Sequence, residues 1–237
     1  MLISWNSQGK NPTSYILANE QGFTGQYKVK PDFICIQEAG GWQPHINGND
    51  IPCLWNPLPS YGYYNQLKRV TINTENYIGY MVPWQASLKG NDRCTLVILW
   101  RESLGTYTDF VIQGWHDGHD THRPVFWIST SSGSLGCIHA PSGGGPTTYQ
   151  YILGAIAQLN YYAPASNWIM AGDFNYPAAT MKSNLPVGVS LIDTGETTQK
   201  SGGNIDYLLH SHINQTYSTA AAADYYVQSD HLQVRFI

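Results

Sequence analysis

Polar side chains that can do acid–base and metal chemistry stand at the ends of several apolar runs in this sequence. Asp230 and His231 directly precede the closing apolar alternation 232–237. A carboxylate beside an imidazole at the mouth of a strand can hold a metal ion or move a proton. Taken alone, such a pair is most often a surface-loop feature. Four other apolar runs also end in a polar residue: 3–6, 33–38, 135–139 and 168–175. Their repetition favours a shared site.

Two of these ends offer oxygen ligands. Glu38 follows the strand-like run 33–37, so its carboxylate is expected to leave the sheet at its edge. Hard cations such as Mg²⁺ prefer oxygen ligands. Asn6 closes the first run and can help to hold a metal or a phosphate. A solvated glutamate and a turn asparagine are the alternative interpretations of these two residues.

The sharpest local signal is the segment 172–175, Gly-Asp-Phe-Asn, which follows the apolar run 168–171. Asp173 and Asn175 alternate about Phe174, which places both on one side of the chain if it is extended there. The carboxylate can orient a water molecule or bind a metal. The amide can hold a phosphate oxygen, and the alternative is an ordinary turn.

The candidate acid–base groups are His139 and His231, whose usual pKa lies close to neutrality. Asp206 lies within strand-like residues and needs a partner if it is buried, so it is a candidate to orient a histidine. Arg123 precedes the strand-like run 124–129 and can clamp a phosphate.

These side chains require a scaffold of short strands. Apolar runs bounded by Gly, Asn, Asp or Ser predict strands at 2–5, 33–37, 94–100, 108–113, 124–129, 135–139, 168–172, 205–209 and 232–237. Apolar residues at helical spacing predict a helix over 147–162, and 13–28 has room for another. Strand, helix and strand follow one another in both halves. The pattern predicts two packed mixed β-sheets flanked by helices, an α/β sandwich in one domain, 1–237.

Composition limits the function classes. The formal net charge is −4, so the chain as a whole lacks a basic surface for extended nucleic-acid binding, although one phosphate can still be held locally. The sequence has no apolar stretch long enough to span a membrane and no visible signal peptide. Cys35 and Cys137 lie in strand patterns and are expected to be buried free thiols, whereas Cys53 and Cys94 could be bridged.

Several further features stay open. The segment 41–92 is expected to form long surface loops with one or two strands, and its aromatic stretch 42–84 is a candidate docking surface or a cover for a sheet edge. The histidine-rich segment 116–122 could bind a metal or be an ordinary surface loop. Gly143–Gly145 could form a flexible rim beside the site or the lead-in to a helix.

The order of these residues along the chain resembles a known family. The supporting phrases are the residues 35–40, 92–96, 122–124, 167–175, 205–207 and 229–231. They are similar to the endonuclease/exonuclease/phosphatase superfamily of deoxyribonuclease I, and in particular to the catalytic B subunits of cytolethal distending toxins. The resemblance covers essentially the whole chain. It implies a four-layer α/β sandwich and a Mg²⁺-dependent phosphodiesterase, with Mn²⁺ or Ca²⁺ as alternative ions.

The resemblance also implies a role for each residue. Glu38, Asn6 and Asp230 would hold the metal, and Arg123 would hold the phosphate. The other roles concern the proton transfers and the bound water: His231, oriented by Asp206, would activate water, His139 would protonate the leaving oxygen, and Asp173 and Asn175 would hold water or phosphate oxygens.

The substrate and setting follow from the same resemblance. DNA is the expected substrate, and the alternative is a phosphoinositide or another lipid headgroup. Cell-binding and delivery subunits of a toxin are the expected partners, for a secreted bacterial effector that acts in the host nucleus. Two departures stand out: the chain is acidic, whereas the toxin subunits are basic, and the glutamate that pairs with the first histidine in deoxyribonuclease I has only Asp92 as a counterpart. A non-catalytic binding module is the third alternative.

Overall fold

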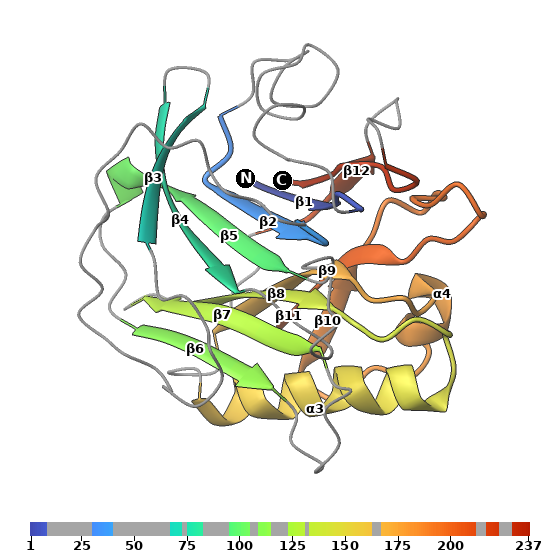
Figure 1. Cartoon of the computed structure of the whole chain (residues 1–237). Helices are drawn as coiled ribbons and strands as arrows, with labels where there is room; N and C mark the ends of the chain where they lie inside the picture. Colours follow the sequence, from blue (N-terminus) through green and yellow to red (C-terminus); the bar gives the residue numbers. More distant parts are fainter. Residues whose placement is uncertain are drawn as a thin grey trace, which may run out of the picture.

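Two β-sheets packed face to face form the main body of the described chain (Figure 1). The computed structural model describes residues 1–8, 30–39, 67–72, 75–82, 95–104, 109–114, 123–130, 133–162, 167–211, 217–222 and 229–237. Within these ranges one sheet has seven strands and the other has six.

The seven-stranded sheet has the order β12-β13-β1-β2-β5-β4-β3. Its strands are β1 (Leu2–Asn6), β2 (Phe33–Gln37), β3 (Leu67–Ile72), β4 (Glu75–Val82), β5 (Leu96–Arg101), β12 (Ala220–Ala222) and β13 (Val234–Phe236). β1 and β2 run parallel in register, with Asn6 opposite Gln37, while the other pairs are antiparallel. Because parallel neighbours end at the same edge, Asn6 and Glu38 come together there.

The six-stranded sheet has the order β10-β11-β9-β8-β7-β6. Its strands are β6 (Asp109–Gly114), β7 (Pro124–Thr130), β8 (Gly133–His139), β9 (Trp168–Asp173), β10 (Val189–Ile192) and β11 (Asp206–Ser211). β8 and β9 are parallel, and β9 is antiparallel to β11. In this register Asp173 lies beside His139 on one side and beside Asp206 on the other.

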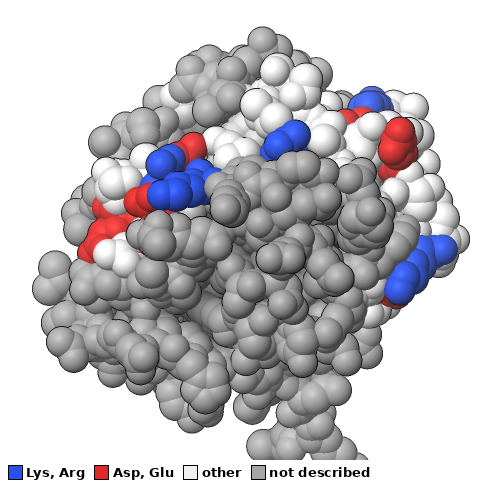
Figure 2. All heavy atoms as spheres, turned by 90° about the horizontal axis from the view of Figure 1, so that it is seen from above, with Lys and Arg blue, Asp and Glu red and all other residues white. Residues whose placement is uncertain are grey.

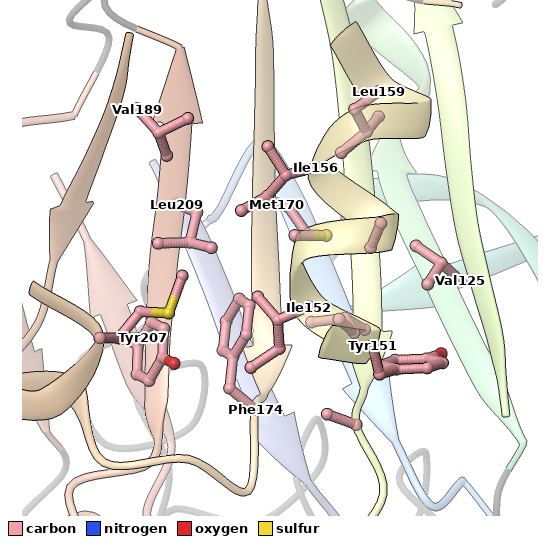
Figure 3. Close-up of a cluster of buried hydrophobic side chains, with 14 of the residues drawn as sticks. Val125, Tyr151, Ile152, Ile156, Leu159, Met170, Phe174, Val189, Tyr207 and Leu209 are labelled. Atoms are coloured by element: carbon pink, nitrogen blue, oxygen red, sulfur yellow. The ribbon is translucent and has the colours of Figure 1, made fainter. Parts of the chain in front are cut away.

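Helix α3 (Pro146–Tyr162) covers the outer face of the six-stranded sheet (Figures 1 and 3). Its apolar face, including Ile152, Ile156 and Leu159, packs on the sheet residues Val125 and Met170. The predicted helix over 147–162 is thereby confirmed. Among the described residues, the short helices are α4 (Ala178–Lys182), beside β10, and η3 (Glu102–Leu104).

A strict alternation of inner and outer positions builds the core between the sheets. On β5, Leu96, Ile98 and Trp100 face the other sheet, whereas Val97 and Leu99 belong to a separate buried cluster. The inner cluster holds residues of both sheets, among them Leu2, Cys35, Phe126, Leu135, Cys137, Ala171 and Leu208. The expected pair of packed mixed sheets is therefore confirmed.

The other expectations about the scaffold are partly tested. Cys35 and Cys137 are buried and free, as expected. The strands β3 and β4 are the ones anticipated within 41–92, whereas the strands β10 and β12 were not predicted. The expected helix at 13–28, the pair Cys53 and Cys94, Asp92 and the segment 116–122 lie outside the described residues, as does most of 42–84. Among the described residues, no helix combines the length and the apolar character needed to cross a membrane.

Candidate active site

The candidate site lies at one end of the sandwich, where several strands have their last side chain that faces the other sheet. On β8 the inner positions are Leu135, Cys137 and then His139, and on β9 they are Ile169, Ala171 and then Asp173. β1 follows the same rule and ends in Asn6. Because side chains alternate with period two, each strand carries its last inner position into the same space between the sheets. All three polar residues are buried.

A tight backbone approach fixes the position of Asp173. The preceding residue, Gly172, has φ +156° and lies so close to β8 that a Cβ atom would stand 1.9 Å from the carbonyl oxygen of Ile138. Only glycine fits there. After Asp173 the chain turns, and Phe174 stacks on Tyr207 of β11 with ring centroids 4.0 Å apart. The close approach of Gly172 to β8 and the stacking of Phe174 on β11 fix the backbone on both sides of Asp173, so its carboxylate lies between β8 and β11.

Asn6 joins the carboxylates that come from the two sheets. Its Nδ2 donates to Asp173 Oδ2 at 2.8 Å and to Glu38 Oε1 at 3.3 Å. Its Oδ1 accepts from the N–H of Gln8 at 3.0 Å, which fixes the orientation of the amide. Glu38 itself follows the end of β2 with φ +49°, and its carbonyl oxygen accepts from Ser7 Oγ at 2.8 Å. The two carboxylates therefore face one another across a single amide.

His139 faces the same two carboxylates from β8. Its Nε2 lies 3.5 Å from Glu38 Oε1 and 3.6 Å from Asp173 Oδ2. Arg123 Nη1 contacts this nitrogen and also donates to the carbonyl oxygen of Ala140 at 2.9 Å. The backbone of Arg123 is held by the hydroxyl of Tyr151, which donates to its carbonyl oxygen. The predicted phosphate-binding arginine is thus placed beside the predicted general acid.

His231 enters the site from the segment before β13 and pairs with Asp206. Its Nδ1 lies 2.9 Å from Asp206 Oδ2 and 3.1 Å from Oδ1. Its Nε2 points the other way, at 3.8 Å from Asp173 Oδ2 and 3.5 Å from Asp230 Oδ1. A buried carboxylate that accepts from Nδ1 leaves Nε2 as the nitrogen that can exchange a proton with a substrate or water. The predicted orienting role of Asp206 agrees with these contacts.

Burial and mutual charge shift the protonation of the site. Burial raises the pKa of Asp173 to about 7, with a further rise from the charge of Asp206, against the opposing effects of His231, Asn6 and Asn175. For His231, burial works to lower the pKa, but Asp206, Asp173 and Asp230 outweigh it and raise the pKa to about 9. The site therefore concentrates negative charge and favours a positive charge in its midst.

We expect the free energy of unfolding to depend on pH through the protonation of His231. A raised pKa in the folded state gives stability that is fully present below the ordinary pKa of 6.5 and is lost as the pH rises through about 9. Asp206→Asn removes the main stabilising partner of the imidazolium. Each unit by which the pKa of His231 falls lowers the free energy of unfolding by about 1.4 kcal/mol at a pH where the ring is charged. Urea unfolding of both proteins at pH 6 and at pH 10 should show a larger deficit of the variant at pH 6. An equal deficit at both values would contradict this assignment.

Two predicted residues lie differently from the simplest expectation. The chain is not extended at Asn175, whose φ is +47°. Its N–H donates to Asp173 Oδ1 at 2.8 Å, and its side chain donates to the carbonyl oxygen of Ala140 at 2.9 Å. Asp230 has 37% of its side chain accessible, and it lies beside His231. Asp173, which was predicted to hold water or phosphate oxygens, is the carboxylate that shares Asn6 with Glu38.

Sequence reasoning missed several residues that support the site. Ser229 Oγ donates to the carbonyl oxygen of Asn6 at 2.7 Å and accepts from the N–H of His231 at 3.1 Å, so it connects β1 with His231. Thr198 and Gln199 contact Asp206 and His231 respectively. Ser229 belongs to the phrase 229–231, whose resemblance to the family could have singled it out. Thr198 and Gln199 lie in a polar stretch with no such signal.

The donor set suits a divalent cation. Ligand atoms of Asp173, Asp206 and His231 lie within 4.8 Å of one another. Since Asp206 and His231 are already paired through Nδ1, the oxygens of Glu38 and Asp173 are better available to a hard cation. Burial, with the charge of Asp206, raises the pKa of Asp173 and disfavours its negative charge. A cation at this edge would supply a compensating positive charge.

Comparisons with known proteins identify the family of this chain. The model of the family described as Endonuclease/Exonuclease/phosphatase family matches residues 3–231. No curated protein matches the chain by sequence.

Solved structures share the fold across almost the entire chain. The cytolethal distending toxin of Haemophilus ducreyi matches with a TM-score of 0.74 and 19% identity, over 100% of this chain and 96% of the other. A structure of CdtB, the biologically active subunit of cytolethal distending toxin, gives a TM-score of 0.71 and 19% identity, over 98% and 95%. The TDP2 protein of D. rerio in complex with a single-strand DNA product gives 0.59 and 16%, over 99% and 96%. At these identities the likeness shows a common fold.

Proposed function

Since this chain belongs to the endonuclease/exonuclease/phosphatase family, we propose that it is a metal-dependent phosphodiesterase that nicks DNA. The single observation that carries the proposal is the arrangement of two buried histidines around Asp173. The Nε2 atoms of His139 and His231 lie 3.6 and 3.8 Å from the same carboxylate oxygen. Two imidazoles around one small space can serve the two proton transfers of phosphodiester hydrolysis.

The geometry supports the following roles. Water attacks the phosphorus atom while His231 Nε2 accepts a proton from it, and Asp206 stabilises the imidazolium that forms. The P–O bond to the leaving oxygen breaks, and His139 gives a proton to that oxygen. Arg123 contacts His139 and can hold a non-bridging phosphate oxygen at the same time. Asn175, at the turn after β9, offers its amide to the phosphate or to water.

Mg²⁺ is the proposed cofactor, with Mn²⁺ or Ca²⁺ as alternatives. Glu38 and Asp173 would hold it, with Asn6 orienting both carboxylates and Asp230 contributing from the His231 side. A bound divalent cation supplies positive charge next to the developing charge of the phosphate. With that charge in place, the carboxylates around His231 attract its proton less strongly, which favours the neutral ring that a base requires.

The charge of the described surface favours binding of a single phosphate over binding along an extended nucleic-acid backbone. On the face seen in Figure 2, the described Lys and Arg side chains lie in small separate groups, most of them beside Asp or Glu. Three such pairs are Arg101 with Asp32, Lys30 with Glu75 and Lys182 with Asp193. This balance, together with the net charge of −4, supports a second candidate substrate, a phosphoinositide headgroup, which does not present the extended row of phosphates that DNA does.

A parallel pair of assays separates the two substrates. Purified protein with Mg²⁺ is incubated with supercoiled plasmid and, separately, with phosphoinositides, and nicked circles and released phosphate are measured. Nicking that depends on His231 supports the DNA-nicking function. Phosphate release without nicking would establish the second candidate instead. If neither nicked circles nor released phosphate is detected, the phosphoesterase function is refuted.

We further propose that the chain acts as the active subunit of a bacterial toxin and reaches the host nucleus through cell-binding and delivery subunits. The likeness of its fold to the cytolethal distending toxin structures supports this role.

We expect the purified chain to be inert when it is added to cultured cells and active when it is placed in their cytosol, because uptake would depend on other subunits. DNA damage and cell-cycle arrest are the measurements, and the His231→Ala variant in the cytosol is the control. Equal potency by both routes would overturn the need for delivery partners.

A further inference from the structure

Three non-glycine residues of the described chain have a positive φ, and all three stand at the candidate site. They are Gln8 at +50°, Glu38 at +49° and Asn175 at +47°. Residues with a Cβ atom rarely adopt this left-handed conformation, and they keep it only where surrounding contacts hold them, most often at functional sites. Glu38 and Asn175 already have proposed roles. Gln8 has none, so its contacts call for an explanation.

The backbone of Gln8 fixes the amide that joins the two carboxylates. Its N–H donates to Asn6 Oδ1 at 3.0 Å. Because a backbone N–H can only donate, the atom that it contacts is the oxygen of the Asn6 amide. The nitrogen of that amide then points to Glu38 and Asp173, to which it donates at 3.3 and 2.8 Å. The turn at Gln8 therefore sets the orientation of Asn6.

The side chain of Gln8 holds a segment that lies 222 residues further along the chain. Its Oε1 accepts from the N–H of Asp230 at 3.1 Å. This donor is also a backbone N–H, so the acceptor is the amide oxygen and the direction of the bond is fixed. His231 follows Asp230 directly. Gln8 thus contacts the amide of Asn6 through its own backbone and the segment 229–231 through its side chain.

Two further hydrogen bonds tie the segment 229–231 to the end of β1, and both are buried: they run from Ser229 Oγ to the carbonyl oxygen of Asn6 at 2.7 Å and from Trp5 Nε1 to that of His231 at 3.3 Å. The bond from Asp230 to Gln8 is the third, and it lies closer to solvent because Gln8 is half-buried. If the side chain of Gln8 were lost, the N–H of Asp230 would turn to water and the segment would keep only the two buried attachments.

We propose that Gln8 is a positioning residue that holds His231 in place relative to the two carboxylates bridged by Asn6. This inference rests on the proposed function, in which His231 acts on the attacking water and the carboxylates hold the cation. These groups come from distant parts of the chain, the carboxylates from the ends of β2 and β9 and the histidine from the segment before β13. A displacement of about 1 Å between such groups can lower a rate about 100-fold.

The kinetic test uses two changes that remove the bond to Asp230 in different ways. Gln8→Met keeps the length of the side chain without the amide oxygen, and Gln8→Asn keeps an amide that is too short but tolerates a positive φ better. We expect kcat of DNA cleavage with Mg²⁺ to fall about tenfold in both, since two of the three attachments remain. KM should stay within about threefold, because Gln8 does not contact the substrate. Gln158→Met, the same change at a half-buried glutamine of α3, is the matched control.

Thermal unfolding separates positioning from a merely structural role. In Gln8→Asn the residue adopts the positive φ more easily, so we expect its Tm to stay within about 4 °C of the wild-type value while its kcat is still reduced. A kcat that falls only in proportion to a loss of folded protein would overturn the proposal. So would wild-type kcat in both variants, or a raised KM with unchanged kcat, which would make Gln8 a substrate-binding residue.

Hydrogen exchange of the Asp230 amide tests the contact without catalysis. In both variants of Gln8, NMR of the metal-free protein should show that this N–H exchanges at least about tenfold faster than in the wild type. The amide of Ala140, which donates to the carbonyl oxygen of Asp173 at 2.9 Å, should keep its rate and is the reference. Unchanged exchange at Asp230 would refute the contact and the proposal, even in an active phosphoesterase. Faster exchange in a protein that cleaves no phosphodiester would confirm the contact but refute the proposed function, and the positioning role with it.

Discussion

His231→Ala and His139→Ala are each expected to lower phosphodiester cleavage by about 10²–10⁴-fold while the fold survives, because each removes one proton transfer from the reaction. Both side chains are nearly fully buried at the end of the sandwich, and both face Asp173, His139 from β8 and His231 from the segment before β13. Initial rates of plasmid nicking, with the fold checked by thermal unfolding, measure the effect.

His210→Ala is the matched control. His210 is also buried, and it lies four residues beyond Asp206 on β11, about 13 Å along the strand from the site. Its loss should change stability without a comparable loss of rate. Retention of more than about a tenth of the wild-type rate by His231→Ala or His139→Ala would remove that histidine from the mechanism.

The polar ends of the apolar runs could be predicted because they follow from strand alternation alone. On β8 and β9 the same period that buries Cys137 and Ala171 carries His139 and Asp173 to the inner end. The helix over 147–162 was equally accessible, since its apolar residues recur at helical spacing. The strand β12 was not, because Ala220–Ala222 is three alanines with little preference for extended structure.

The contacts among the site residues could not be predicted from spacing. Glu38 and Asp173 belong to different sheets, and only the packing of the sheets brings both to the amide of Asn6. Gln199 lies in a stretch rich in polar residues and glycine, which has the composition of an ordinary solvated turn. Only the structure shows that Gln199 lies opposite His231 in an antiparallel bridge. Local sequence fixes the direction of a side chain, whereas its partners depend on pairings across long sequence separation.

The second large effect is expected at the cation. Excess EDTA should abolish activity, and Glu38→Gln should lower it by at least two orders of magnitude, because a cation next to the phosphate contributes several kcal/mol. Binding is measured without substrate, as the increase in thermal stability that Mg²⁺ produces, about 2.7 kcal/mol at 100 times its Kd. The variant should need at least tenfold more Mg²⁺ for the same increase. Glu75→Gln, which removes a carboxylate paired with Lys30 far along the chain from the site, is the control.

The pH dependence of this binding identifies the second ligand. Burial raises the pKa of Asp173 to about 7, so below that pH a proton occupies the carboxylate that we assign to the cation. Mg²⁺ must displace that proton, and its affinity should therefore fall as the pH decreases from about 8 to 6. In Asp173→Asn no such proton exists, so affinity should be weak and should change less with pH than in the wild type over this range. A wild-type affinity that does not change between these values, or full activity in EDTA, would contradict a cation held between Glu38 and Asp173.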